Sequence, residues 1–406
     1  MENYIHLFET QTDFENKYYG EEYVEPWLSL TDETNKVSYN KSERELLKEQ
    51  PLTFEIIGDG NIYWKASDSA HTKTLQYKLN DGEWTEITSA TGSAVPSISV
   101  VSGDTVQFIG YNETQILENN SFSGTTCQFK VKGNIMSLFD GDLYKTLKLT
   151  EGSYNFAYLF SWCKNLVSAK DLILPSEVTQ GCYLFLFQGC TYLVETPILP
   201  AKVMAHGCYC EMFEGCTHLE KAPELPSTTL ADTCYVMMFA YCYSLKKAPK
   251  LPATTLASEC YMGMFYNCKS LTTAPELPAT TLTLACYASM FAECLGLTTA
   301  PELPATTLTE RCYLQMFRKC TSLIQAPELP AETLTDSCYY EMFSGCTNLN
   351  YIKCLATDIS ASRCTNGWVQ GVASTGTFVR NPNMSSWTTG INGIPEGWTI
   401  VDVDVS

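Results

Sequence analysis

Apolar positions recur along most of this chain with a fixed step of 26 residues, and the repeated text is almost identical from unit to unit. Cysteines mark the step in two series. The first series is Cys182, Cys208, Cys234, Cys260, Cys286, Cys312, Cys338 and Cys364, and the second is Cys190, Cys216, Cys242, Cys268, Cys294, Cys320 and Cys346. A period of about twenty to fifty residues predicts stacked units, because one such unit is too small to bury its own apolar face.

Each unit divides into two halves with different patterns. In the unit that begins at Cys260, apolar residues at helical spacing predict a helical turn or two: Cys260, Met264, Phe265, Cys268 and Leu271. The second half, around Ala274-Pro275-Glu276-Leu277-Pro278, predicts an extended segment that pairs with the same segment of the next unit, about 4.8 Å away. Because proline cannot donate to a ladder, we expect this strand to be short or to lack one bond per unit.

Stacking of like units is expected to place like side chains in columns. One predicted column is the phenylalanine spine Phe213, Phe239, Phe265, Phe291, Phe317 and Phe343, and another is the leucine spine Leu225, Leu251, Leu277, Leu303 and Leu329. Two cysteines eight residues apart on a helical turn lie about 12 Å apart along the axis, too far for a disulfide. We therefore expect free thiols that act as small buried apolar groups with a weak donor.

The chain divides into four predicted regions. Residues 1–50 are polar and aromatic-rich, and we expect them to anchor the chain or to dock onto a partner. Residues 51–133 contain about seven short strand-like runs, with Asn80-Asp81-Gly82 as a hairpin signal, and predict an immunoglobulin-like β-sandwich. Residues 134–367 hold the repeats behind a degenerate first unit, and residues 368–406 predict a C-terminal β cap. The predicted fold class is mixed α/β, a solenoid of 26-residue units preceded by the β-sandwich.

Composition narrows the classes of partner. The chain has 45 acidic and 26 basic residues, and its formal net charge is −19. An acidic surface repels a phosphate backbone, so we expect no nucleic-acid partner. No apolar run reaches the length of about eighteen residues that a membrane span needs, so we expect no membrane insertion. The start at Met1-Glu2-Asn3 lacks the basic and apolar regions of a signal peptide, so we expect a protein that leaves the cell without one.

The sequence offers little to carry catalysis. Its four histidines are His6, His71, His206 and His218, and no nucleophile or phosphate-loop pattern accompanies them. We therefore expect no enzyme, no catalytic residue and no cofactor. The group His206, Cys210 and His218 has ligand types that suit zinc. Its spacing is inherited from the repeat, so we assign no metal site and keep zinc as an alternative.

Residues that break the repeat are the candidate binding residues. They are not needed for stacking, so we expect them to face solvent, where a partner can contact them; neutral drift on an exposed face is the alternative explanation. The candidates are Glu211, Lys221, Met237, Lys246, Lys247, Met262, Gln315, Gln325, Tyr340 and Glu341.

The repeated core Met-Phe-x-x-Cys-x-x-Leu-x-x-Ala-Pro-x-Leu-Pro, as in residues 264–278, resembles a known repeat. It is similar to the BspA-like leucine-rich repeat, whose units carry Phe-x-x-Cys-x-x-Leu-x-x-Ile-x-Leu-Pro. The resemblance covers residues 154–364, with a longer period and with Ala-Pro in place of a β-branched strand residue. It implies a leucine-rich-repeat solenoid that serves surface binding or adhesion, of the kind common in gut Bacteroidetes, and it supplies no catalytic residues.

The layout as a whole, with its leaderless start, also resembles proteins encoded by bacteriophages of those hosts. This resemblance implies a virion component of the tail or head fibre type, located on the virion or an extracellular surface. The solenoid would recognise a host-surface protein or glycan, and residues 1–50 would bind protein partners in the assembly. A bacterial cell-surface adhesin and a purely structural spacer stay as alternatives. A homo-oligomer also stays open, although no coiled-coil heptads are present to drive one.

Overall fold

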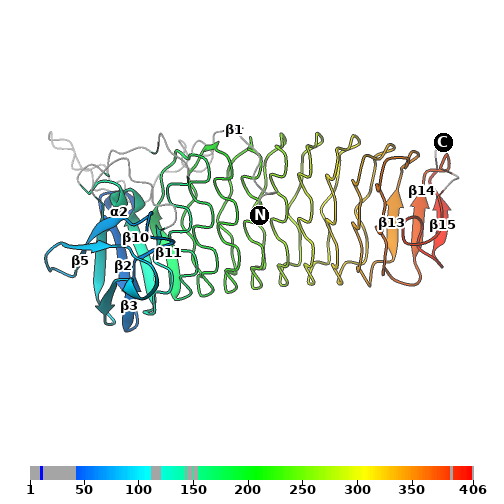
Figure 1. Cartoon of the computed structure of the whole chain (residues 1–406). Coiled ribbons are helices and arrows are strands. Elements are labelled where there is room, and N and C mark those ends of the chain that lie inside the picture. The colour runs from blue at the N-terminus through cyan, green and yellow to red at the C-terminus, as the bar shows by residue number, and fades with distance from the viewer. Residues whose placement is uncertain are drawn as a thin grey trace, which may run out of the picture.

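The computed structural model describes residues 10–11, 43–110, 120–141, 144, 149, 154–384 and 387–404. Over these residues the fold is rich in β structure and has very few helices: α2 at Glu43–Lys48 and the short 3-10 helices η1 at Gly92–Ala94 and η2 at Ile135–Leu138. Strands gather at the two ends of an elongated molecule, and turn-rich units are stacked between them (Figure 1). The sheets themselves do not form a solenoid. No helix in these ranges has the length and apolarity needed to cross a bilayer.

The N-terminal β region is built on a six-stranded sheet of order β11-β10-β2-β8-β5-β6. Its strands are β2 Leu52–Ile56, β5 Thr74–Leu79, β6 Thr85–Thr88, β8 Thr105–Ile109, β10 Phe129–Asn134 and β11 Leu166–Ile173. The predicted hairpin at Asn80-Asp81-Gly82 is confirmed, because β5 and β6 pair antiparallel and Asn80 has a φ of 50°. The turn itself is closed by the N–H of Gly82, which donates to Leu79 O at 3.0 Å, and the last residues that pair before it are Tyr77 and Thr85.

Three pairs of short strands complete the N-terminal part. They are β3 Gly60–Tyr63 with β7 Ser97–Val100, β4 Lys65–Ala66 with β9 Asn120–Ser121, and β1 Thr10–Gln11 with β12 Val203–Met204. Most of the predicted anchoring segment, residues 1–9 and 12–42, lies outside the described part of the chain.

The N-terminal β region and the repeated units share one sheet and one core. Strand β11 belongs to the degenerate first unit, yet it pairs in parallel with β10. The ring centroid of Phe160, in the same unit, lies 6.1 Å from that of Phe54 and 5.9 Å from that of Phe122. The boundary predicted between residues 133 and 134 therefore lies inside a strand and beside a continuous apolar core.

The first half of each unit is a chain of turns, and the predicted helical turns are wrong. We call this half the turn segment, for example residues 259–268. In that segment Glu259, Gly263 and Asn267 have φ values of 55°, 61° and 60°. A left-handed residue at every fourth position stops a right-handed helix from growing, because the helix needs negative φ at each residue. The same three positions are left-handed in every unit from Tyr154 to Gly371.

Alternate amides of the turn segment donate inside the unit and to the next unit. The N–H of Met262 donates to Glu259 O at 3.0 Å, whereas the N–H of Gly263 donates to Ala288 O at 2.8 Å. The N–H of Phe265 likewise donates across the unit boundary, to Met290 O at 2.9 Å. Backbone donors of this half are thus satisfied without helix or strand, which is what burial of a backbone requires.

Two columns of stacked aromatic rings fill the core of the stack. The phenylalanine column is confirmed: ring centroids from Phe187 to Phe343 follow one another at 5.4–5.8 Å with nearly parallel planes. A second column, which the sequence analysis did not identify, runs from Tyr183 to Tyr339 at 5.6–6.2 Å. These spacings lie in the range of favourable offset stacking. Both columns meet at Trp368, which lies 6.1 Å from Tyr339 and 6.3 Å from Phe343, and Trp387 stacks on Trp368 at 5.7 Å. The predicted leucine spine is also buried.

The nineteen cysteines are free thiols, and all are buried. The second series makes the weak donor contact that the sequence predicts: Cys268 Sγ donates to Phe239 O at 3.1 Å, and the same bond recurs for Cys190, Cys216, Cys242, Cys294, Cys320 and Cys346. Burial raises the pKa of Cys286 to about 11 and that of Cys294 to about 12. Such thiols stay protonated at neutral pH, so they are poor nucleophiles and poor metal ligands.

The second half of each unit is extended but is not a regular strand. We call it the bridge segment, for example residues 272–282. It pairs with neighbouring units at single positions, such as Thr273 with Thr299 and Thr281 with Thr307. Prolines between these positions lack an N–H and limit the pairing to isolated bridges.

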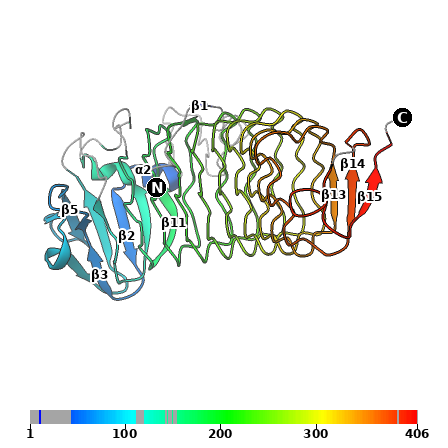
Figure 2. The same cartoon turned by 45° about the vertical axis from the view of Figure 1, so that its right-hand side comes forward.

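Regular strands return only at the C-terminal end. There β13 Tyr351–Cys354, β14 Thr377–Arg380 and β15 Thr399–Asp402 form a parallel sheet (Figure 2). Strands β14 and β15 lie within residues 368–406, where the sequence predicts a C-terminal β cap.

Candidate functional site

The candidate binding residues fall on two different faces of the stack. We call the surface of the turn segments the turn face and the surface of the bridge segments the bridge face. Six candidates belong to turn segments, namely Glu211, Met237, Met262, Gln315, Tyr340 and Glu341. Four belong to bridge segments, namely Lys221, Lys246, Lys247 and Gln325. The structure therefore does not bring the ten residues together into one site.

The candidates on the turn face are half-buried, so the expectation that they face solvent freely is wrong for them. Glu211, Met237, Gln315 and Glu341 occupy the left-handed position three residues after the first cysteine, with φ between 48° and 54°. This geometry lays the side chain along the stack: a Cβ added at Gly263 would lie 3.0 Å from Met237 Cγ. The preceding residues Cys210, Val236 and Ala288 also break the repeat, yet they are buried.

The candidates on the bridge face are exposed, as the sequence predicts. Lys221 and Lys247 occupy equivalent positions in neighbouring units and form an isolated parallel bridge. Lys246 Nζ lies 2.7 Å from Glu220 Oε2, with both side chains mostly exposed, so this ion pair adds little stability. The sequence changes along the face from these charged residues to threonines and then to Ile324 and Gln325. The bridge face thus varies in chemistry while its backbone is repeated.

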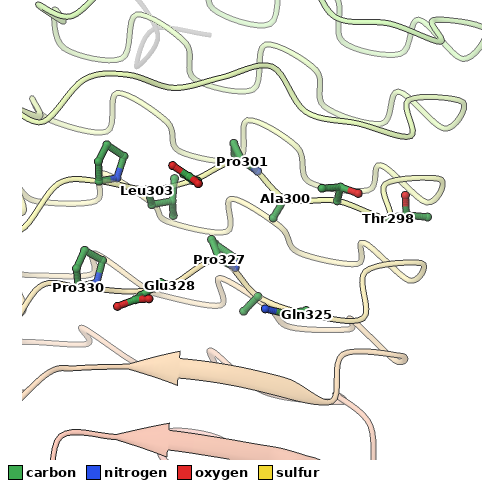
Figure 3. Close-up of a pocket in the computed structure, with 12 residues that line it drawn as sticks. Thr298, Ala300, Pro301, Leu303, Gln325, Pro327, Glu328 and Pro330 are labelled. Carbon is green, nitrogen blue, oxygen red and sulfur yellow. The ribbon is translucent and has the colours of Figure 1, made fainter. Parts of the chain in front are cut away.

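A groove of about 740 Å³ lies on the bridge face between two neighbouring units. It is lined by residues 298–304 of one unit and by residues 325–328 and 330 of the next. The two bridge segments run side by side, and Pro301 and Pro327 take equivalent places on them (Figure 3). The candidate residue Gln325 belongs to its wall. The groove is open and elongated, so it fits an extended ligand better than a compact one.

A missing backbone pair accompanies the groove, and among the described residues the equivalent pair is also missing at the boundary between Lys247 and Thr273. Over residues 154–384, which are described without a gap, Thr273 bridges Thr299 and Gln325 bridges Tyr351, but no bridge joins Thr299 to Gln325. Pro301 and Pro327 have no N–H to donate across the boundary between the two units. The short side chains of Ala300 and Ala326 fill little of the space that remains.

The groove combines an apolar floor with polar edges. Proline rings and the buried Leu303 supply the apolar part, whereas Thr298, Glu302 and Gln325 are exposed. Glu328 Oε1 lies 3.0 Å from Lys353 Nζ, and both groups reach solvent. Hydroxyl, amide and carboxylate groups along an apolar floor can hydrogen-bond a polypeptide segment or a glycan. In the described part of the chain, no three or more His, Cys, Asp or Glu residues are placed to hold a metal ion.

The zinc alternative depends on three residues that the structure does not bring together. His206 and Cys210 lie beside one small hollow of the turn face. His218 is exposed elsewhere, with its ring centroid 4.9 Å from that of Tyr192 and its Nδ1 2.6 Å from Thr191 O. Burial also raises the pKa of Cys210 well above its usual value. The cluster therefore lacks both the geometry and the ready thiolate of a zinc site.

Comparison of the chain with protein-family models, with curated proteins and with solved structures finds no match. A function is therefore inferred from the geometry of the two faces. The groove residues Pro301, Glu302 and Pro327 were missed by the sequence analysis, because they conform to the repeat. The recurrent prolines mark the bridge segments of the neighbouring units as well, so they give no sign that distinguishes this boundary from the others.

Proposed function

We propose that the chain is a non-enzymatic binding protein that uses the bridge face to contact an extended ligand on a host surface. In this proposal the stacked units are a solenoid of the BspA-like leucine-rich-repeat type, and residues 51–133 are an immunoglobulin-like β-sandwich that supports it. The observation that carries the proposal is the groove of about 740 Å³ on an exposed face whose chemistry varies while its backbone repeats. An elongated, chemically variable surface on a repeated scaffold suits recognition.

The proposed setting is a bacteriophage virion, where the chain would be a fibre-type component. Residues 1–50 would attach it to other virion proteins, and the groove would bind a host-surface protein or glycan. A bacterial surface adhesin would use the same face in the same way. The layout resemblance and the pattern at residues 154–364 support this setting, and imaging of the protein in its native particle tests it directly.

The experiment compares binding of labelled protein to intact cells of gut Bacteroidetes strains. The test variant Thr299→Arg with Gln325→Arg places two large charged side chains in the groove, and we expect it to lower the apparent affinity tenfold or more. The control variant Asn366→Arg adds the same kind of charge at an exposed residue of a turn segment, and we expect no change. Cells treated with periodate lose glycans and cells treated with a protease lose proteins, so the two treatments identify the class of receptor.

Two results would contradict this proposal. If the groove variant and the control bind a positive strain equally well, the groove is not the contact surface. If the wild-type protein binds none of the strains and no isolated cell-surface fraction, the recognition function itself is wrong. Circular dichroism of the variants checks that each retains the wild-type fold.

A structural spacer is the second candidate function, and one observation favours it. A single apolar core runs from Phe54 in the N-terminal β region to Trp368 at the far end, which gives a stiff body. Deletion of residues 260–311 removes two whole units and leaves like positions adjacent at the junction. Retained host binding with failed particle assembly would support the spacer, whereas the opposite result supports recognition.

A further inference from the structure

A second concave site lies on the turn face, near the N-terminal end of the stack. It is a hollow of about 210 Å³. Gly181 and Gly207 occupy the same left-handed position in consecutive units, each with a φ of 58°. In the next two units this position carries Thr233 and Glu259. Glycine at position 207 leaves open space there, because an added Cβ would meet only Thr233 Oγ1, at 3.7 Å.

The wall of the hollow is aromatic. The rings of Tyr158 and Phe185 stack with centroids 4.7 Å apart and planes inclined by 23°. The ring of Tyr154 covers Gly181, so closely that a Cβ added there would clash with it. Leu184 completes the apolar part of the wall. Faces of aromatic rings carry partial negative charge and attract cations.

A carboxyl group completes the lining. Glu211 is half-buried in the hollow, and the described residues that line it include no lysine or arginine. Gln188 Nε2 donates to Glu214 Oε2 at 2.5 Å and lies 3.5 Å from Glu211 Oε2, so one amide serves both carboxyl groups. Burial, together with the like charge of Glu214, raises the pKa of Glu211 to about 8. Two neighbouring carboxyl groups beside three aromatic rings form a site that a cation would stabilise.

We propose that this hollow binds a small ammonium ligand, with the cationic nitrogen against the rings of Tyr154 and Phe185 and its charge met by Glu211. An anion would be repelled by Glu211 and Glu214, and a neutral apolar ligand would make no charge-assisted contact with Glu211, whose own partner is the Gln188 amide that it shares with Glu214. The ligand class is an alkylated ammonium, which a choline headgroup or a lysine side chain can supply. This inference is independent of the proposed role of the bridge face.

The charge of Glu211 gives the binding a defined pH dependence. A bound cation favours the carboxylate, so binding below pH 8 releases a proton and tightens as the pH rises toward 8. Among the described residues, the other titratable groups that face the hollow or Glu211 include Glu214, His206, Cys210, Tyr154 and Tyr158. Burial keeps Cys210 neutral over this range, because its pKa is raised well above the usual value. A neutral ligand of the same shape would release no proton.

The test uses choline and its uncharged isostere 3,3-dimethylbutan-1-ol as probes in isothermal titration calorimetry of the full chain. We expect choline to bind about tenfold more tightly than the isostere at pH 8.5, or tighter still, because one charge-assisted contact changes an affinity by about that factor. Titration in two buffers with different ionisation enthalpies measures the proton released at pH 6.5. n-Butylammonium, as a mimic of a lysine side chain, distinguishes that source of the ammonium group from a quaternary headgroup.

Two variants and one control locate the site. Glu211→Gln and Phe185→Leu should each weaken choline binding by about tenfold, the first through the charge and the second through the ring face. Glu341→Gln is the matched control, because Glu341 occupies the same left-handed position five units further along the stack. Equal affinity for choline and the isostere would overturn the proposal, and so would the absence of saturable choline binding. The proton-release measurement needs only the wild-type chain, so it decides the question even if a variant fails to fold.

Discussion

The turn segments and the bridge segments belong to the same 26-residue units, yet they satisfy their backbones in different ways. In the turn segment, alternate N–H groups donate within the unit and to the next unit, as Met262 and Gly263 illustrate. In the bridge segment, pairing is reduced to isolated positions such as Thr273 with Thr299. Both aromatic columns and both cysteine series originate from the turn segments. The comparison teaches that one half of the unit holds the stack together, while the other half leaves backbone and surface available for a groove.

The largest expected effect comes from breaking a column in the turn segment. Phe265→Ala removes a fully buried ring between Phe239 and Phe291, and we expect a loss of about 3–5 kcal/mol in the free energy of unfolding. Leu303→Ala, at a buried residue of a bridge segment, should cost about 2–3 kcal/mol. Urea denaturation followed by circular dichroism measures both values. A greater loss for Leu303→Ala than for Phe265→Ala would contradict the division of roles between the two halves.

An alanine pair sharpens the comparison at the level of the backbone. Ala285 lies in a turn segment with a φ of 48°, whereas Ala279 lies in a bridge segment and is not left-handed. Glycine relieves the left-handed strain at position 285 but only adds chain entropy to the unfolded state at position 279. We therefore expect Ala285→Gly to leave the protein more stable than Ala279→Gly by about 1–2 kcal/mol. Both alanines are buried, so the lost methyl group is matched. Equal thermal midpoints for the two variants would show that the left-handed positions are not strained.

The smallest expected effect separates the two cysteine series. Cys268 and Cys260 are both fully buried, but Cys268 Sγ donates to Phe239 O, whereas among the described residues Cys260 Sγ donates to no carbonyl of a neighbouring unit. Cys268→Ala should therefore cost about 0.5 kcal/mol more than Cys260→Ala. The difference is measurable by parallel denaturant titrations under reducing conditions. A reversed order would mean that the thiol–carbonyl contact makes no net contribution to the free energy of unfolding.

Much of the fold was predictable because the repeat is written directly in the sequence. The 26-residue step gave the phenylalanine column and the burial of the cysteines, and Asn80-Asp81-Gly82 gave the hairpin between β5 and β6. The predicted helical turns failed because a left-handed residue every fourth position spaces apolar residues much as a helix does. Glu259 gives little local sign of a positive φ, whereas Asn267 is of a residue type enriched there. The stronger sign lies in the column, because Gly181 and Gly207 stand at the position of Glu259 in other units, and Gly189 and Gly215 stand at that of Asn267.

The candidate site was less predictable, because departure from the repeat is a poor guide to exposure. Departure from the repeat correctly selected Gln325, which lines the groove. Pro301 and Glu302 also line it, but they conform to the repeat and were not predicted. Departure from the repeat also selected Glu211 and Met237, whose left-handed backbones turn their side chains along the stack. Whether a side chain faces solvent depends on φ at its own residue and on the size of the residue in the next unit. Neither quantity can be read from one unit alone.

Near-identity of the units has a consequence for how the chain finds its native pairing. A copy that docks one step out of place meets the same phenylalanine, tyrosine and cysteine contacts that it would meet in the correct place. The contacts in the middle of the stack are therefore the same in the native and in the shifted register, and only the contacts at the two ends differ. Two residues make contacts of this kind at the ends of the stack. Phe160 packs on the N-terminal core, and Trp368 contacts both ring columns. These two end residues therefore set the register of the copies between them, and their loss would remove the contacts that distinguish the native register from a shifted one.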